Sequence, residues 1–171
     1  METTLLSDFK KNTTTLLDFI HQVDATHLLV NPSREEWSIM DCCEHILQLE
    51  QALIRLFRGS VEKVNEAASE QTIAIIKNRL LAIDNKMTAF GIILPQRIYK
   101  NKEDISQAIQ ETRTMLHRIG TNNGWNKKCM MYAHPSFGHL TRLEWIAFCT
   151  YHVERHLYQM KSILTKLSRC P

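Results

Sequence analysis

The sequence predicts an all-α protein built as a four-helix bundle, and three observations lead to this fold class. Only five of the 171 residues are glycine and four are proline, so the elements between turns are expected to be long. Apolar residues in the longer segments recur every three or four positions, which places them on one face of an α-helix. Two of these segments open with a helix capping box. Helices that each bury one apolar face pack together as a bundle.

The first predicted helix runs from about Thr4 to Val23. Its apolar residues fall mainly at three-to-four-residue spacing, which defines a buried face. The intervening polar residues Lys10, Lys11 and Asn12 are therefore expected on the exposed side.

The second predicted helix runs from about Ile39 to Arg58, after a turn at residues 31–33. Ser38 and Asp41 form the capping box at its start, in which each side chain satisfies a free amide of the first turn. His45 falls on the apolar stripe of this helix, about two turns past the cap. We therefore expect His45 on the buried side.

The middle of the chain has a weaker pattern. Residues 73–87 predict a further helix, and residues 91–95 an irregular connection. The pattern strengthens again from Glu103 to Ile119, which predicts a long helix that Gly120 is expected to stop.

The last third begins with residues 121–139, which are rich in Asn, Gly, Pro and Lys and are expected to form an unusually long loop. Thr141 and Glu144 then repeat the capping-box pattern. The last helix is predicted from there to about Lys166. Four long helices with one extended connection describe a helical bundle.

Composition and charge favour a soluble protein with one domain over residues 1–171, because 44% hydrophobic and 23% charged residues are ordinary for globular chains. The net charge of +3 is small and no basic run is dense, so nucleic acid is not an expected partner. No segment has the length of a membrane span or the apolar core of a signal peptide. The five cysteines are odd in number and lack CxxC spacing, which favours reduced thiols in a cytoplasm.

Two histidines lie in the middle of the apolar stripe of the last predicted helix. His152 and His156 are four residues apart, so their β-carbons are expected about 5–6 Å apart on one face. Two imidazoles at this spacing can bind one ion with metal–nitrogen bonds of about 2.0–2.1 Å. His45, on the core stripe of another helix, is the third candidate. The sequence therefore predicts a metal site of three histidines from two facing helices.

Three protein ligands leave a coordination position open, as in catalytic rather than structural zinc sites. Imidazole suits zinc, nickel, copper and iron, so the ligands do not name the metal, and zinc or nickel is the expected divalent ion. Such an ion can lower the pKa of a bound water or thiol and so produce a nucleophile near neutral pH. The alternative is a hydrogen-bonded core network without metal, although each unpaired buried polar group costs about 1–3 kcal/mol.

For four other residues near these positions the sequence leaves two roles possible. His134 and His139 precede the last helix and are expected in surface or capping roles, although His139 can also approach the open face of the metal. Cys42 and Cys149 each lie about one turn before a candidate histidine. Either thiol can serve as a ligand or nucleophile, but a small core residue is the more common role.

Two acidic residues flank His45 on its helix. Asp41 and Glu44 are candidates to orient the imidazole by accepting a hydrogen bond, with a solvated helix face as the alternative for Glu44. Several aromatic residues are expected to pack in the core, with some forming a wall of the pocket: Trp37, Trp125, Trp145, Phe137 and Tyr151.

Three different short motifs occur along the chain. The sequence EWSIMDCCEHI at 36–46 matches W-S-x(5)-E-H-hydrophobic, HPSFGHLTRLEW at 134–145 matches H-P-x-F-G-x-L-T-x-x-E-W, and HVERHLYQ at 152–159 matches H-x-x-x-H-x-x-Q. In order and spacing these elements resemble the DinB/YfiT-like superfamily of bacterial metal-binding four-helix bundles. Residues 61–133 are similar to the family only in general character.

The resemblance implies metal-ligand roles for His45, His152 and His156. It also implies an up-down-down-up topology, with a long connection between the second and third bundle helices, and a homodimer. Family members include thiol-dependent S-transferases and isomerases, so a low-molecular-weight thiol and a small-molecule substrate are expected partners. A metal-dependent hydrolase and a stress-related, non-catalytic metal-binding module remain as alternatives.

Overall fold

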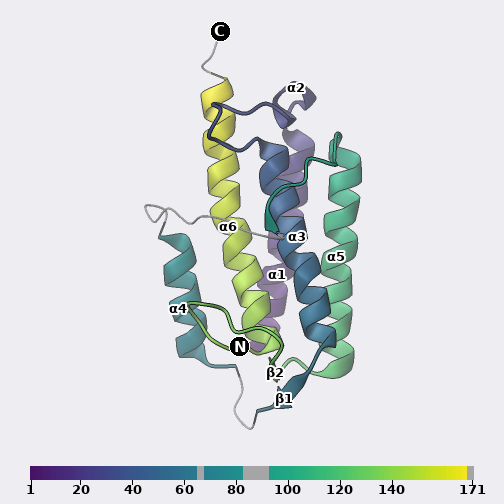
Figure 1. The fold of residues 1–171 in the computed structure, drawn as a ribbon, viewed down its shortest axis with the longest axis vertical. Helices are drawn as coiled ribbons and strands as arrows, with labels where there is room; N and C mark the ends of the chain where they lie inside the picture. Colours follow the sequence, from purple (N-terminus) through teal and green to yellow (C-terminus); the bar gives the residue numbers. More distant parts are fainter. Residues whose placement is uncertain (65–67, 83–92, 169–171) are drawn as a thin grey trace.

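The computed structural model describes residues 1–64, 68–82 and 93–168. Four long helices lie side by side, as predicted (Figure 1): α1 (Glu2–Gln22), α3 (Ile39–Arg58), α5 (Lys102–Asn123) and α6 (Arg142–Leu167). Their apolar faces meet in the centre of the bundle. Within the described ranges, no helix combines the length and apolar character needed to cross a membrane.

The bundle has the expected up-down-down-up topology. In Figure 1, α1 and α6 run upward, while α3 and α5 run downward. Because α3 and α5 are parallel, the chain between them must return along the length of the bundle. The helix α4 (Glu70–Leu81) belongs to this return and packs on the outside of α6.

The helix α4 begins earlier than the pattern at 73–87 predicts. Ser69 caps it by accepting a hydrogen bond from the amide of Thr72 at 3.3 Å. Its predicted end at residue 87 lies outside the described ranges. Of the irregular connection expected at 91–95, the last three residues are described and belong to no α-helix or strand.

The long loop predicted at 121–139 is partly wrong. It contains the strand β2 (Lys127–Cys129), which pairs antiparallel with β1 (Val61–Lys63) at the lower end of the bundle (Figure 1). The short helix α2 (Ala25–Leu28) lies at the opposite end. Each strand has only three residues, two of them charged, so there is little apolar signal for periodicity to detect.

Both capping boxes are confirmed. At the start of α3, the Ser38 hydroxyl accepts from the Asp41 amide and the Asp41 carboxylate accepts from the Ser38 amide, each at 3.0 Å. Thr141 and Glu144 make the same reciprocal pair at the start of α6. These local contacts explain why both helix starts could be predicted.

The predicted end of α5 at Gly120 is wrong, because the helix continues to Asn123. Gly124 ends it with φ 87°, a left-handed conformation that favours glycine. Gly120 serves packing instead. A β-carbon at that position would lie 2.2 Å from the ring of Trp125, so the ring covers the helix backbone there.

A buried polar network joins the four bundle helices, and it corrects the exposed position expected for Asn12. Arg113 on α5 bonds to Glu50 on α3 at 2.6 Å, and its other terminal nitrogen donates to Asn12 and Thr13 on α1, both at 2.9 Å. The Asn12 amide donates to the Thr150 carbonyl on α6 at 3.2 Å. All five residues are buried, so the network fixes how the helices align.

Candidate metal centre

The three predicted histidines converge between α3 and α6. The Nε2 atom of His152 lies 3.1 Å from Nε2 of His45 and 3.0 Å from Nε2 of His156. One ligand nitrogen from each ring lies within 4.8 Å of the others, and all three side chains are buried. Two nitrogens bound tetrahedrally to one zinc ion are about 3.3 Å apart, given bonds of about 2.0–2.1 Å. The cluster therefore fits a divalent ion with small adjustments.

In two of the rings the outer nitrogen, Nδ1, carries the proton, so the lone pair of the inner nitrogen, Nε2, points into the cluster. His45 Nδ1 donates to the carbonyl of Ile93 at 2.7 Å, and His156 Nδ1 donates to Oε1 of Gln159 at 2.9 Å. A neutral imidazole carries one proton, so Nε2 of both rings is left as an acceptor. Two lone pairs thus face the ring of His152.

The third ring cannot satisfy both of these acceptors. His152 Nδ1 is buried and has no hydrogen-bond partner among the described residues. Even with its single proton on Nε2, His152 can donate to only one of its two neighbours. A cation between the three Nε2 atoms would remove this conflict, which is why the cluster fits a metal better than a hydrogen-bonded core network.

Burial lowers the pKa of all three imidazoles. For His45 desolvation is the main cause, and for His152 it acts together with repulsion from the two neighbouring rings. Desolvation lowers the pKa of His156 to about 3. The rings are therefore neutral at pH 7, the form that binds metal ions.

Two aromatic rings wall the cluster. The ring centroid of Trp37 lies 5.0 Å from that of His45 and 6.4 Å from that of His156. Phe148 stacks on His152, with centroids 5.6 Å apart and planes 16° apart. Trp37 therefore lies against two of the candidate ligands. The other four aromatic residues considered from the sequence pack in or against the hydrophobic core: Trp125, Trp145, Phe137 and Tyr151.

The predicted roles of Asp41 and Glu44 are wrong. Asp41 bonds to the Ser38 amide and to the guanidinium of Arg97 instead of an imidazole. Glu44 is 1% exposed, so it lies on no solvated face, and it accepts hydrogen bonds from three backbone amides between residues 96 and 99. Helical periodicity could not predict the role of Glu44, because its partners are backbone amides far away in the chain and such amides leave no pattern in the sequence.

Of the two histidines expected in surface or capping roles, His139 lies at the surface and His134 is half-buried within its own loop. His134 Nδ1 accepts from the Ser136 amide at 3.1 Å, and its ring stacks on Phe137 at a centroid distance of 4.5 Å. His139 is exposed and bonds to the carbonyl of Cys129 on β2 at 3.1 Å. The alternative in which His139 approaches the metal is therefore not observed.

The two cysteines next to the histidines are core residues. Cys42 and Cys149 are both fully buried, and neither belongs to the cluster of ligand atoms. Desolvation raises the pKa of each thiol well above its usual value. Neither thiol is therefore suited to act as a nucleophile.

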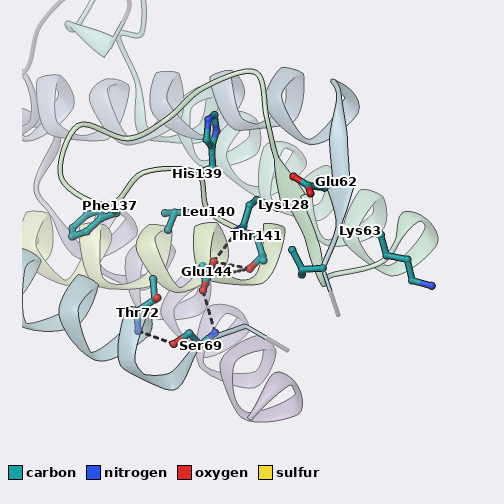
Figure 2. A pocket seen from close by; sticks show the side chains of 11 residues that line it. Glu62, Lys63, Ser69, Thr72, Lys128, Phe137, His139, Leu140, Thr141 and Glu144 are labelled. Carbon is teal, nitrogen blue, oxygen red and sulfur yellow. Dashed lines mark hydrogen bonds between the residues drawn. The ribbon is translucent and has the colours of Figure 1, made fainter. Parts of the chain in front are cut away.

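A cavity of about 470 Å³ lies at the N-terminal end of α6, between α4 and the strands (Figure 2). Its buried carboxylate, Glu144, is already bonded to the amides of Ser69 at 3.1 Å and Thr141 at 2.8 Å. Glu144 precedes His152 by about 12 Å along the helix axis. The cavity is thus separate from the histidine cluster.

Two orienting groups were missed by sequence reasoning. Gln159 follows His156 by three residues and so shares its helix face, a spacing that could have identified it. The Ile93 carbonyl gave no such signal, because it comes from the irregular connection.

Fold and cluster together define a helical bundle with a buried three-histidine centre that can hold a metal ion. The sequence model of the DinB superfamily matches residues 8–160, and the chain belongs to this family. The Bacillus subtilis (strain 168) protein named "Uncharacterized protein YuaE" is 26% identical over 142 residues, which are 81% of this chain and 83% of that protein. The crystal structure of TT2238, a four-helix bundle protein, has a TM-score of 0.60 at 16% identity and covers 95% of this chain and 99% of its own. That likeness concerns the fold alone.

Proposed function

We propose that this protein is a metal-dependent enzyme that binds one zinc or nickel ion through His45, His152 and His156. The observation that carries the proposal is the convergence of three buried Nε2 atoms beside the rings of Trp37 and Phe148. Three protein ligands are the number found in catalytic zinc sites, whereas structural sites use four.

The residues around the cluster prepare it to bind a metal ion. The Ile93 carbonyl and Gln159 hold two rings in the tautomer that directs Nε2 inward. The rings of Trp37 and Phe148 exclude water from one side of the imidazoles and keep them neutral. When bound, the ion would supply Lewis acidity that lowers the pKa of a thiol or water at its open position.

The reaction we propose is transfer of a low-molecular-weight thiol to a small electrophile: the thiol gives up its proton, a carbon–sulfur bond forms, and the leaving group, halide in the case of an aryl halide, departs with the bonding electron pair. The described cysteines support an external thiol, because all four are buried and their pKa values are raised, to about 12 for Cys43 and about 11 for Cys129. None of these four described cysteines is therefore suited to supply the attacking sulfur, and we propose that the sulfur arrives with a separate molecule.

The test combines metal analysis with a thiol-conjugation assay. Untagged wild-type protein should contain zinc or nickel and conjugate a small thiol to an aryl halide, and His152→Ala should lose both properties. His139→Ala is the matched control, because His139 is exposed and lies outside the cluster. Loss of metal from His152→Ala without loss of conjugation would refute the transferase.

The same preparation separates the alternatives. Ester or amide hydrolysis that needs no thiol and disappears in His152→Ala would indicate a hydrolase. Bound metal without turnover of either kind would indicate a non-catalytic binding module.

A further inference from the structure

A buried carboxylate holds the backbone that orients His45. Glu44 on α3 accepts hydrogen bonds from three amides: one oxygen accepts from Gln96 at 2.7 Å and from Arg97 at 2.5 Å, and the other accepts from Tyr99 at 2.9 Å. The Glu44 side chain is 1% exposed. The contacts therefore fasten residues 96–99 to one point on α3.

The segment adopts an unusual backbone conformation around this carboxylate. Arg97 has φ 58°, in the left-handed region that only a few per cent of non-glycine residues occupy. Two successive amides that point to one oxygen form an anion-binding nest. Asp41, one turn earlier on α3, bonds to the Arg97 side chain at 3.0 Å and braces the same bend.

The acceptor of His45 lies three residues before the first amide that Glu44 holds. The Ile93 carbonyl receives the proton of His45 Nδ1 at 2.7 Å, and His45 directly follows Glu44 on the helix. Glu44 thus anchors this part of the chain to α3, and the next residue, His45, donates its hydrogen bond to the same part of the chain.

We infer that Glu44 is a positioning residue of the metal centre. Through the segment 93–99, Glu44 holds the Ile93 carbonyl where it keeps the proton of His45 on Nδ1 and leaves Nε2 free for the ion. The inference rests on the proposed metal site. Partners that orient a metal-binding histidine typically change metal affinity by about 10–100-fold when they are lost.

Substitution of Glu44 by glutamine tests this role. Glutamine has nearly the same shape, but its amide nitrogen cannot accept a hydrogen bond, so at least one backbone amide loses its partner. Zinc titration against a competing chelator should show about 10–100-fold weaker binding in Glu44→Gln. Glu36→Gln is the matched control, because Glu36 is half-exposed and pairs with Lys166 instead of the segment, and it should bind zinc as the wild type does.

A second measurement does not depend on metal. The ¹⁵N shifts of the His45 ring in the metal-free protein should report the Nδ1–H tautomer in the wild type and in Glu36→Gln. Glu44→Gln should show a mixture of tautomers. A residue that only stabilises the fold would lower the thermal stability of the variant and leave both the zinc affinity and the tautomer unchanged, which would overturn the inference.

The two proposals fail in different ways. If the wild type binds neither zinc nor nickel, the metal centre itself is refuted, and the tautomer in the metal-free protein then decides whether Glu44 positions His45.

If Glu44→Gln does not fold, Glu44→Asp is the substitute, because it keeps the charge but is one methylene too short to reach all three amides. It should show the same two effects, and wild-type behaviour in both measurements would overturn the inference.

Discussion

Replacing Arg113 with methionine is expected to destabilise the protein by about 3–5 kcal/mol. The Arg113 and Glu50 side chains are 2% and 0% exposed and lie 2.6 Å apart. Methionine fills much of the volume of arginine but leaves the Glu50 carboxylate buried without a counterion. Breaking a buried ion pair from one side has a cost of this size because the remaining charge stays desolvated.

Loss of the Arg113 hydrogen bonds should also weaken metal binding. The network that contains Arg113 ends at the Thr150 carbonyl, two residues before His152, and Glu50 lies about one turn after His45. The network therefore aligns α3 and α6, the two helices that carry the candidate ligands. A weaker zinc affinity in Arg113→Met would follow from this alignment.

Denaturant unfolding of the metal-free protein, followed by far-ultraviolet circular dichroism at pH 7, measures the stability loss. Arg118→Met is the control, because Arg118 is exposed on the same helix, and it should change stability by about 0.5 kcal/mol at most. The double variant Arg113→Met/Glu50→Leu should be more stable than Arg113→Met, since it removes the stranded charge as well. A loss below about 1 kcal/mol, or a double variant less stable than the single one, would refute the reasoning.

Three further predictions concern pH, orientation of the second ring and packing. The metal-free protein should lose stability as the pH falls below 6.5, because burial lowers the folded-state pKa of His156 from 6.5 to about 3 while the unfolded chain takes up the proton first. His156→Leu should lose less stability than the wild type between about pH 6.5 and pH 5 in denaturant titrations, and an equal loss would contradict this. Gln159→Leu removes the acceptor of His156 Nδ1 and should weaken zinc binding about 10–100-fold in chelator competition, whereas wild-type affinity would show that Gln159 is dispensable. Gly120→Ala should destabilise the fold by about 1–3 kcal/mol in thermal unfolding despite the better helix propensity of alanine, because its β-carbon would meet the ring of Trp125, and a raised midpoint would show that the ring moves aside.

The features that the sequence predicted depend on neighbours in the chain. The start of α3 follows from a reciprocal contact between Ser38 and Asp41, three residues apart. The pairing of His152 with His156 follows from the helical repeat, and His45 could be added because it lies on the apolar stripe of its own helix. The four bundle helices and the candidate cluster were therefore accessible from periodicity and caps alone.

The features that were missed depend on partners distant in the chain. Asn12 was expected on the surface because a polar residue beside lysines is usually solvated, yet its partners Arg113 and Thr150 come from two other helices. Gly120 was expected to end α5, and only the position of Trp125 shows that it permits close packing instead. Both expectations would apply to an isolated helix, but contacts with other parts of the fold overrode them here.

Glu44 shows the same limit at the centre of the proposed site. Its three hydrogen-bond partners are backbone amides, which every residue except proline has. The side chains at 96–99 therefore do not predict the contact. The orienting partner of His45 is likewise a carbonyl. Side-chain ligands can thus be read from a sequence, whereas the backbone that holds them in one tautomer becomes visible only when the chain is folded. An acidic residue beside a buried ligand histidine is for this reason worth testing as an anchor for an irregular segment, even where helical periodicity would place it in solvent.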